Sequence, residues 1–219
     1  SGISKTLRIF YFMIIQPVTN QYQLKEYYKA GSLPYRNSSV YRITEEDIVR
    51  LVSEGNSIFH KHAQVKLFLI HNSDNEVIGR FGLLKDERLP DYIQVVFLEI
   101  LSGRNPVKNI EKKAVEAFPG TKNICFGLQG HLNYGAGILE NRFKEAPVFG
   151  FSYNPSYYME FFEGYKRNEA VSFQIPVLKP DSFLTKLNDR MTDRGFRVRC
   201  LQKKFFKNEI AEYTHLNNL

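Results

Sequence analysis

The sequence has few cysteines, no internal repeat and no long hydrophobic run. Its two cysteines, Cys125 and Cys200, lie far apart and lack the close spacing of a zinc knuckle or a redox pair. We therefore interpret both as reduced, small hydrophobic residues, which excludes a disulfide framework and favours a cytoplasmic location. No repeat or low-complexity stretch is present, which excludes a repeat architecture.

The amino-terminal run from Ile9 to Ile15, which follows Lys5 and Arg8, has the charged and hydrophobic parts of a signal peptide. It is too short to span a bilayer, and no small-x-small cleavage site follows it. Gln16 and Pro17 interrupt it where an export signal would continue. We interpret it as a buried first strand and expect no membrane association.

Composition indicates an ordinary globular chain. With 219 residues, 43% of them hydrophobic, the chain can bury a full core without metals or disulfides, in one large domain or one and a half small ones. Thirty Lys and Arg against 23 Asp and Glu give a net charge of +7, which favours anionic partners such as phosphorylated cofactors, nucleic acid or acidic lipid. The basic residues are scattered rather than arranged in a stripe, so nucleic-acid binding is disfavoured.

Hydrophobic periodicity and turn residues predict a mixed sheet with helices on its faces, an α/β fold. The predicted strands are 13–18, 66–71, 77–84, 93–101, 123–128, 148–151 and 171–175. Helices are predicted over 21–29, around 48–52, over 105–117 and after Asn154. Beyond residue 176 the pattern predicts a helix, a strand over 196–200 and a final helix, a tail too small to fold alone.

Four strings of the sequence carry a resemblance to a known family: "NSIFHKHAQVKLFLIHNSDNEVIGRFGLL" from Asn56, "FLEIL" from Phe97, "HLNYGAGILENRF" from His131 and "PVFGFSYNPSYYMEFFEGY" from Pro147. They resemble the N-acetyltransferase (GNAT) superfamily, in particular the first domain of a poorly characterised bacterial family built from two tandem GNAT-like domains. The resemblance runs from residue 13 to the carboxyl terminus, and only the string at 153–158 is distinctive.

The resemblance implies an acyl-CoA N-acyltransferase fold with a six- to seven-stranded sheet. Residues 1–12 would be an extension, 13–176 the GNAT-like domain, and 177–219 a tail that resembles the start of a second domain. This tail must pack against the first unit, pair with another chain as in a homodimer, or remain disordered.

The resemblance also implies acetyl-CoA or another acyl-CoA as co-substrate and a small-molecule amine, or another acceptor, as its partner. The family's pyrophosphate loop, Arg/Gln-x-x-Gly-x-Gly/Ala, maps onto residues 102–106, where only one of its glycines is present. A helix start still offers free amides there. The cofactor-binding candidates are Leu98, Ile100, Gly103, Arg104, Asn105, Lys108 and Asn154. The alternative is a plain strand-to-helix turn with lysines on a solvated helix face.

The catalytic candidates implied by the resemblance are Glu99 as general base and Tyr157 or Tyr158 as proton donor to the leaving thiolate. Tyr158 shares an apolar helical stripe and favours a core position, so Tyr157 is the better donor. Glu99 has the alternative of facing solvent in an alternating strand. Asn154 is interpreted first as a helix cap.

His60 and His62 lack a third ligand at metal spacing, so no metal site is predicted. The preferred interpretation of the sequence is an acyltransferase, and the alternative is a noncatalytic GNAT-like binding or interaction module. An open cleft between the fourth and fifth strands favours the first, and aromatic rings filling that cleft favour the second.

Overall fold

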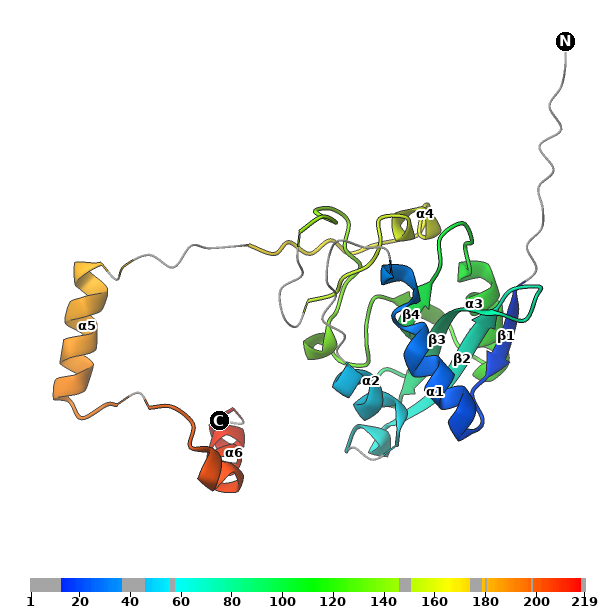
Figure 1. Cartoon of the computed structure of the whole chain (residues 1–219). Coiled ribbons are helices and arrows are strands. Elements are labelled where there is room, and N and C mark those ends of the chain that lie inside the picture. The colour runs from blue at the N-terminus through cyan, green and yellow to red at the C-terminus, as the bar shows by residue number, and fades with distance from the viewer. Residues whose placement is uncertain are drawn as a thin grey trace, which may run out of the picture. The chain divides into compact units, whose positions relative to one another are not determined.

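The computed structural model describes residues 13–36, 46–55, 58–145, 151–173, 179, 181–197 and 199–217. The chain divides into two compact units, Ser1–Ala170 and Val171–Leu219 (Figure 1). The predicted extension 1–12 and the predicted boundary at residue 176 both lie outside the described residues.

Over the described residues, unit 1 contains one sheet and the helices that cover it, and unit 2 contains helices without a strand. The elements of unit 1 are β1 (Ile14–Pro17), α1 (Gln21–Ala30), the 3-10 helix η1 (Leu33–Tyr35), α2 (Glu46–Ser53), η2 (Ile58–Lys61), β2 (Ala63–His71), β3 (Val77–Asp86), β4 (Tyr92–Ile100), α3 (Val107–Ala117), β5 (Asn123–Phe126), η3 (Leu132–Tyr134) and α4 (Tyr158–Phe161). Those of unit 2 are α5 (Ser182–Asp193), η4 (Lys203–Phe205) and α6 (Phe206–Asn217).

The sheet has the order β1-β2-β3-β4-β5. The first four strands pair antiparallel, and β5 pairs parallel to β4 after the crossover through α3. The predicted α/β class with a mixed sheet and flanking helices is confirmed. The described residues contain five strands rather than six or seven.

Two predicted strands do not form over their described parts. Residues 151 and 171–173 are not in strands, while 148–150 and 174–175 lie outside the described residues. Val171 and Phe173 are exposed, so their apolar alternation has no sheet face to bury. In unit 2 the described part of 196–200 is not a strand either.

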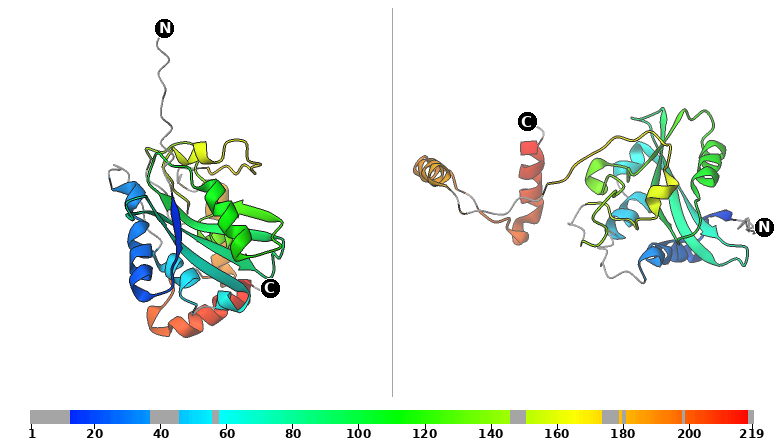
Figure 2. Two further views of the ribbon diagram at one scale, coloured as in Figure 1. Left: turned by 90° about the vertical axis from the view of Figure 1, so that its right-hand side faces the viewer. Right: turned by 90° about the horizontal axis from the view of Figure 1, so that it is seen from above.

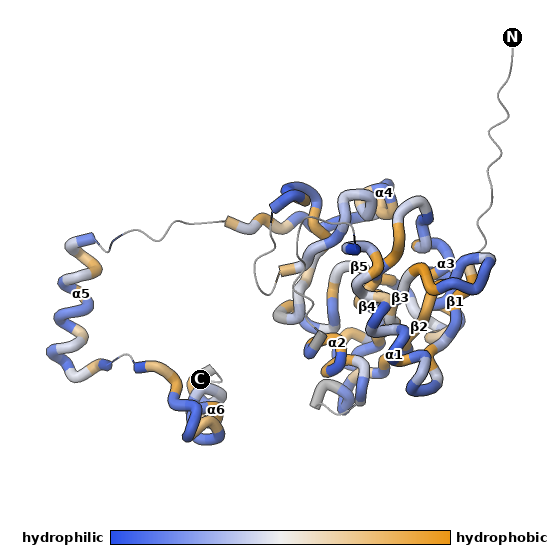
Figure 3. The backbone as a smooth tube through the Cα atoms, viewed as in Figure 1, coloured by the Kyte–Doolittle hydropathy of each residue, from blue (hydrophilic) through white to orange (hydrophobic). Residues whose placement is uncertain are grey.

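Side chains from the central strands alternate between two apolar layers on opposite faces of the sheet, as the period of a strand requires. Phe68 and Ile70 of β2 pack in the layer that holds α3 and α4. Leu67 and Leu69 pack in the layer that holds α1 and α2. Figure 2 shows α1 and α3 on opposite faces, and Figure 3 shows apolar residues concentrated along the central strands.

A buried arginine stabilises the carboxyl end of α1. Arg80 of β3 is 3% exposed, and its Nη1 donates to the carbonyl oxygen of Tyr27 at 3.0 Å and lies 3.5 Å from that of Tyr28. These carbonyls carry the negative end of the helix dipole, so they compensate the guanidinium charge. Gly31 makes room for this side chain, because a Cβ there would overlap the Arg80 guanidinium.

Replacing Gly31 with alanine is expected to destabilise the protein by about 1–3 kcal/mol, the cost of overpacking a filled site. Gly31 has a φ of −61° and a ψ of −23°, which alanine adopts readily. Backbone preference alone would therefore make this substitution stabilising by up to about 1 kcal/mol. The sign of the change in unfolding free energy, measured by urea denaturation, separates the two effects.

The control is the same Gly31 substitution in an Arg80→Ala background, where the guanidinium is gone. There the alanine is expected to be neutral or stabilising, and the double-mutant cycle gives the coupling. An equal cost in both backgrounds would contradict a clash with Arg80.

Unit 2 consists of helices whose apolar side chains are exposed. Asp181 caps α5 by accepting a hydrogen bond from the Leu184 amide at 2.8 Å, which confirms the predicted helix start. The exposed apolar residues of α5 and α6 include Phe183, Leu184, Leu187, Phe206, Ile210, Tyr213 and Leu216. Pairing of two copies through this unit remains a prediction.

A bilayer-spanning helix would need a longer apolar stretch than any helix in the described part of the chain provides.

Candidate functional site

The sheet opens where β5 ends. β4 and β5 pair from Tyr92 and Asn123 to Val95 and Phe126, and β4 then continues to Ile100 with no strand from the described residues beside it on that side. The predicted divergence of the fourth and fifth strands is therefore present. Main-chain groups of the last residues of β4 face the opening instead of a ladder.

An irregularity in β4 marks the start of the opening. Between Gly82 and Arg80 of β3, the partner residues advance from Val96 to Glu99 on β4, so β4 has one extra residue there. Phe97 has a φ of +54°. An extra residue on one strand increases its local twist and bends it, which turns β4 away from β5.

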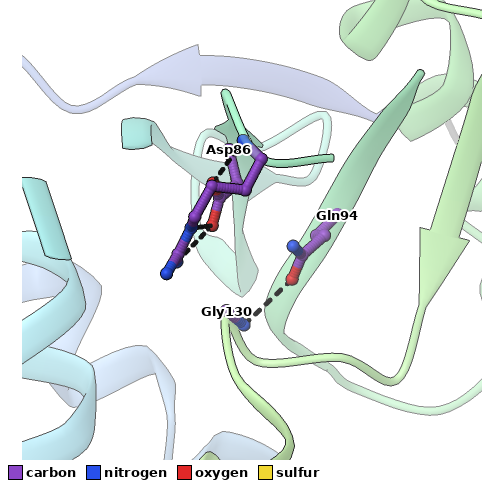
Figure 4. A network of polar contacts seen from close by, with 4 residues as sticks. Asp86, Gln94 and Gly130 are labelled. Carbon is purple, nitrogen blue, oxygen red and sulfur yellow. Dashed lines mark hydrogen bonds and ion pairs between the residues drawn. The ribbon is translucent and has the colours of Figure 1, made fainter. Parts of the chain in front are cut away.

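Two glutamine side chains connect β4 to the segment after β5 in place of strand pairing. The Phe97 amide donates to Gln129 Oε1 at 2.7 Å. The Gly130 amide donates to Gln94 Oε1 at 3.1 Å, as Figure 4 shows. Gln94 is almost fully buried. A glutamine side chain bridges a larger backbone separation than a direct main-chain hydrogen bond does. These contacts therefore hold the two segments together while their backbones stay apart.

The hydroxyls of Tyr157 and Tyr158 form hydrogen bonds with the main-chain amide and carbonyl of Ile100, which face the opening. The Ile100 amide donates to the Tyr158 hydroxyl at 2.9 Å, and the Tyr157 hydroxyl donates to the Ile100 carbonyl at 2.6 Å. The Tyr158 hydroxyl also lies 3.3 Å from the Leu98 carbonyl. The main-chain groups expected to be free for an acyl-CoA arm at Ile100 are thus satisfied by α4 and the residue before it.

Glu99 lies beside this tyrosine pair and is 2% exposed, so the alternative in which it faces solvent is wrong. Its Oε2 accepts a hydrogen bond from the Tyr35 hydroxyl at 2.8 Å and lies 3.4 Å from the Tyr158 hydroxyl. A hydroxyl has one proton, so Tyr158 donates either to Glu99 or to Leu98. The three predicted catalytic residues are brought together at one point of β4.

Their environment makes Tyr157 and Tyr158 weaker acids. Burial, and then the negative charge of Glu99, raise the pKa of Tyr157 above its ordinary value. The same two causes, in the same order, also raise the pKa of Tyr158 above its ordinary value. Both phenols therefore stay protonated as hydrogen-bond donors. A proton transfer from either one to a thiolate with a pKa near 8.5 is uphill in this arrangement.

The predicted phosphate-binding segment lies at the start of α3 and contacts α4. Pro106 takes the cap position of α3, one residue later than predicted, and Asn105 Oδ1 accepts a hydrogen bond from the Val107 amide at 3.0 Å. Its Nδ2 donates to the Phe161 carbonyl at 3.4 Å. Gly103 has a φ of +85°, which favours glycine, and nothing lies within 4 Å of a Cβ placed there. The start of α3 and the tyrosine pair are therefore linked through the α4 turn.

Lys108 is exposed but already has partners. Its Nζ donates to Glu111 at 2.9 Å and lies 5.1 Å from the centre of the Tyr165 ring. Contact with Tyr165, and then with Glu111, raises the pKa of Lys108 above its ordinary value. Arg104 is half-buried at the same end of α3. Both remain predictions as cofactor-binding residues.

The prediction of Asn154 as a helix cap is wrong. α4 begins four residues later, and Tyr157 takes the cap position. Asn154 is buried, and its side-chain amide binds the backbone of Leu139 at both ends, at 2.6 Å to the amide and 3.2 Å to the carbonyl. Asn154 therefore anchors the preceding loop, and both ends of its side-chain amide are engaged there.

Sequence reasoning missed Tyr35, Gln94 and Gln129. Tyr35 reaches Glu99 from 64 positions away. The two glutamines bridge β4 and the segment after β5 because these strands diverge, and no local sequence pattern identifies such a contact. Tyr35 of η1 and Tyr158 of α4, which lie on different elements, converge on one carboxylate, and a linear pattern does not show this.

In the described ranges, no group of three His, Cys, Asp or Glu side chains is placed to hold a metal ion.

No family model matches the chain, and no curated protein matches it. Among solved structures, the chain is similar to one described as "Putative acetyl transferase from Pyrococcus furiosus", with 16% identity and a TM-score of 0.40. The alignment covers 76% of this chain and 100% of that one. A TM-score at this level does not establish a common fold, so the functional assignment rests on the geometry of the chain itself.

Proposed function

We propose that unit 1 is a GNAT-like N-acyltransferase that binds an acyl-CoA in the opening between β4 and β5 and transfers its acyl group to an amine. The observation that carries this proposal is the end of strand pairing at Val95 and Phe126, with Glu99 buried just beyond it. An amide-bearing arm needs main-chain donors and acceptors on an unpaired strand, and the last residues of β4 supply them.

The residues at the opening fit such an arm on one condition. Ile100 offers an amide and a carbonyl side by side, which suits an amide group of the arm, but both now bind tyrosine hydroxyls. An arm that uses them must replace those hydroxyls. Gly103, Arg104, Asn105 and the start of α3 would meet the phosphate end, and Glu99 would accept a proton from the acceptor amine. The bound acyl-CoA supplies the thioester that the amine attacks.

The proposal is tested by adding acetyl-CoA to the full chain while following thermal unfolding. Ligand at 100 times its Kd stabilises by about 2.7 kcal/mol, which is a shift of several degrees for a unit of this size. Adenosine 3′,5′-bisphosphate, which lacks the arm, serves as the control and should shift the midpoint less. Turnover is then measured as thiol released with a panel of amines. No shift at millimolar acetyl-CoA and no thiol release would overturn the proposal.

A noncatalytic binding module is the second candidate, because the tyrosine hydroxyls already satisfy Ile100. In that case the tyrosines keep the opening closed to ligands, and the unit binds a partner at another surface. Acyl-CoA-dependent thiol release above the rate of spontaneous hydrolysis would eliminate this candidate.

Tyr157→Phe is expected to raise the affinity for acetyl-CoA by about two- to tenfold. The substitution removes the hydroxyl that competes for the Ile100 carbonyl, a hydrogen bond of about 0.5–1.5 kcal/mol. Isothermal titration compares it with the wild type. Tyr28→Phe is the control, because that hydroxyl binds Glu54 on the opposite face of the sheet. A lower affinity in Tyr157→Phe would mean that this hydroxyl contacts the ligand rather than competing with it.

A further inference from the structure

Tyr35 of η1 joins the buried Glu99 to a less buried part of unit 1. Its hydroxyl donates to Glu99 Oε2 at 2.8 Å and lies 3.3 Å from the Tyr153 carbonyl. Glu99 is 2% exposed, whereas Tyr35 is half-buried. Tyr35 therefore links the buried Glu99 carboxylate to the less buried region around η1.

Burial of Glu99 creates a difficulty for direct proton transfer. An ammonium ion that reached this carboxylate would have to lose most of its hydration, which costs several kcal/mol unless the pairing compensates it. A phenolic hydroxyl both donates and accepts a hydrogen bond. A hydroxyl bonded to the carboxylate can thus receive a proton on one side and release its own on the other, and the ammonium ion stays at the less buried position.

We propose that Tyr35 is a catalytic residue of the acyl transfer: its hydroxyl contacts the acceptor amine and relays the proton of that amine to Glu99. This inference rests on the proposed function. A proton moves from the ammonium nitrogen to the Tyr35 oxygen while the Tyr35 hydroxyl proton moves to Glu99 Oε2. The neutral amine then forms a C–N bond with the thioester carbonyl carbon.

The remaining step balances as follows. The C–S bond breaks and its electron pair stays on sulfur, which takes the second proton lost by the nitrogen. The products are an amide and a free thiol, and the proton held by Glu99 leaves to solvent through Tyr35. An ammonium ion and a thioester thus give an amide, a thiol and one released proton.

The groups around Glu99 are consistent with this role. Arg80 is its partner across the β3–β4 pair and places a positive charge on the same face. The charge of Glu99 contributes to raising the pKa of three phenols, after the larger effect of burial. These phenols are Tyr27 of α1, Tyr158 of α4 and the adjoining Tyr157. The hydroxyls of Tyr35 and Tyr158 both lie near Glu99 Oε2, and Tyr35 is the more exposed of these two residues.

The test compares Tyr35→Phe with Tyr153→Phe in the full chain. The Tyr153 ring lies 5.9 Å from the Tyr35 ring, but its hydroxyl donates to the Phe143 carbonyl at 2.7 Å. Tyr35→Phe is expected to lower kcat/KM for the amine by about 10–100-fold, part of the effect of a general base. The KM for acetyl-CoA should change less than about twofold, and the pH profile of kcat/KM should change. Tyr153→Phe should keep rate and profile within about threefold.

The outcomes separate this inference from the function on which it rests. No thiol release by the wild type with any amine overturns both. Wild-type turnover with an equal rate in Tyr35→Phe overturns the role of Tyr35 alone. An equal loss in both variants, or a loss in Tyr35→Phe with an unchanged pH profile and a lower melting temperature, assigns Tyr35 a structural role and also overturns it.

Discussion

Replacing Glu99 with glutamine is expected to lower kcat for acyl transfer by about 10²–10⁴-fold, the range that a general base contributes. Glutamine keeps an oxygen that accepts the Tyr35 hydrogen bond but does not take up a proton at neutral pH. The Kd for acetyl-CoA should stay within about threefold of the wild type, because the arm is expected to bind main-chain groups. Single-turnover thiol release and calorimetric titration measure the two quantities.

The matched control is Glu116→Gln on α3, where the carboxylate is partly exposed and pairs with Lys113 at 2.7 Å. It is expected to show wild-type kinetics, since surface changes of this kind have small effects. A wild-type rate in Glu99→Gln would contradict the assignment of the base. Glu99 would then be a buried hydrogen-bond acceptor that fixes the two tyrosines.

Most of the secondary structure of unit 1 was predictable because its signals are local. The helix over 21–29 and the strand pair 66–71 and 77–84 are confirmed to within a few residues. Asn105 binds the first amide of α3, as its position before Pro106 suggested. In each case, the hydrophobic periodicity, the cap residue and the turn residues predict the same element, and the tertiary contacts of the fold favour that element too.

The Asn154 segment shows where local signals fail. Asparagine followed by proline indicates a helix start, yet the described helix is only four residues long. The Asn154 side chain binds the Leu139 backbone instead, a contact with a residue 15 positions away. A buried amide that satisfies another segment gains more than a solvent-exposed cap does, and spacing alone does not reveal that contact.

The candidate site was predictable in part. Glu99, Tyr157 and Tyr158 were singled out on a resemblance, and the structure brings them together. Tyr35 was not, because its contact depends on where η1 lies relative to β4. The extra residue near Phe97 also has no sequence signal, since a positive φ is usually carried by glycine or asparagine rather than phenylalanine.

The opening combines features of both functional alternatives. The strands diverge, as an acyl-CoA site requires, and tyrosine hydroxyls bind the β4 main chain at the opening, as a closed module would have. These features are compatible if α4 moves and releases the Ile100 main-chain groups when a ligand binds. Four residues of α-helix contain little hydrogen bonding of their own, so this turn is held by its side chains rather than by its backbone.

Replacing Tyr158 with alanine is accordingly expected to destabilise unit 1 by about 3–5 kcal/mol, the usual cost of removing a buried aromatic ring. Tyr158 is 3% exposed and packs against Phe161 with ring centres 5.2 Å apart. The loss of its hydroxyl also leaves the buried Ile100 amide without an acceptor, which costs about 1–3 kcal/mol. Urea denaturation followed by near-ultraviolet circular dichroism measures the change.

Tyr158→Phe isolates the hydroxyl and should account for about 1–3 kcal/mol of that loss. Tyr22→Ala on α1 is the matched control: that side chain is 73% exposed, so its removal should change the unfolding free energy by about 0.5 kcal/mol or less. If Tyr158→Ala were as mild as Tyr22→Ala, the α4 turn would not be packed into the core. The hydrogen bonds at Ile100 would then be too weak to close the opening, and access of a ligand would need no rearrangement of α4.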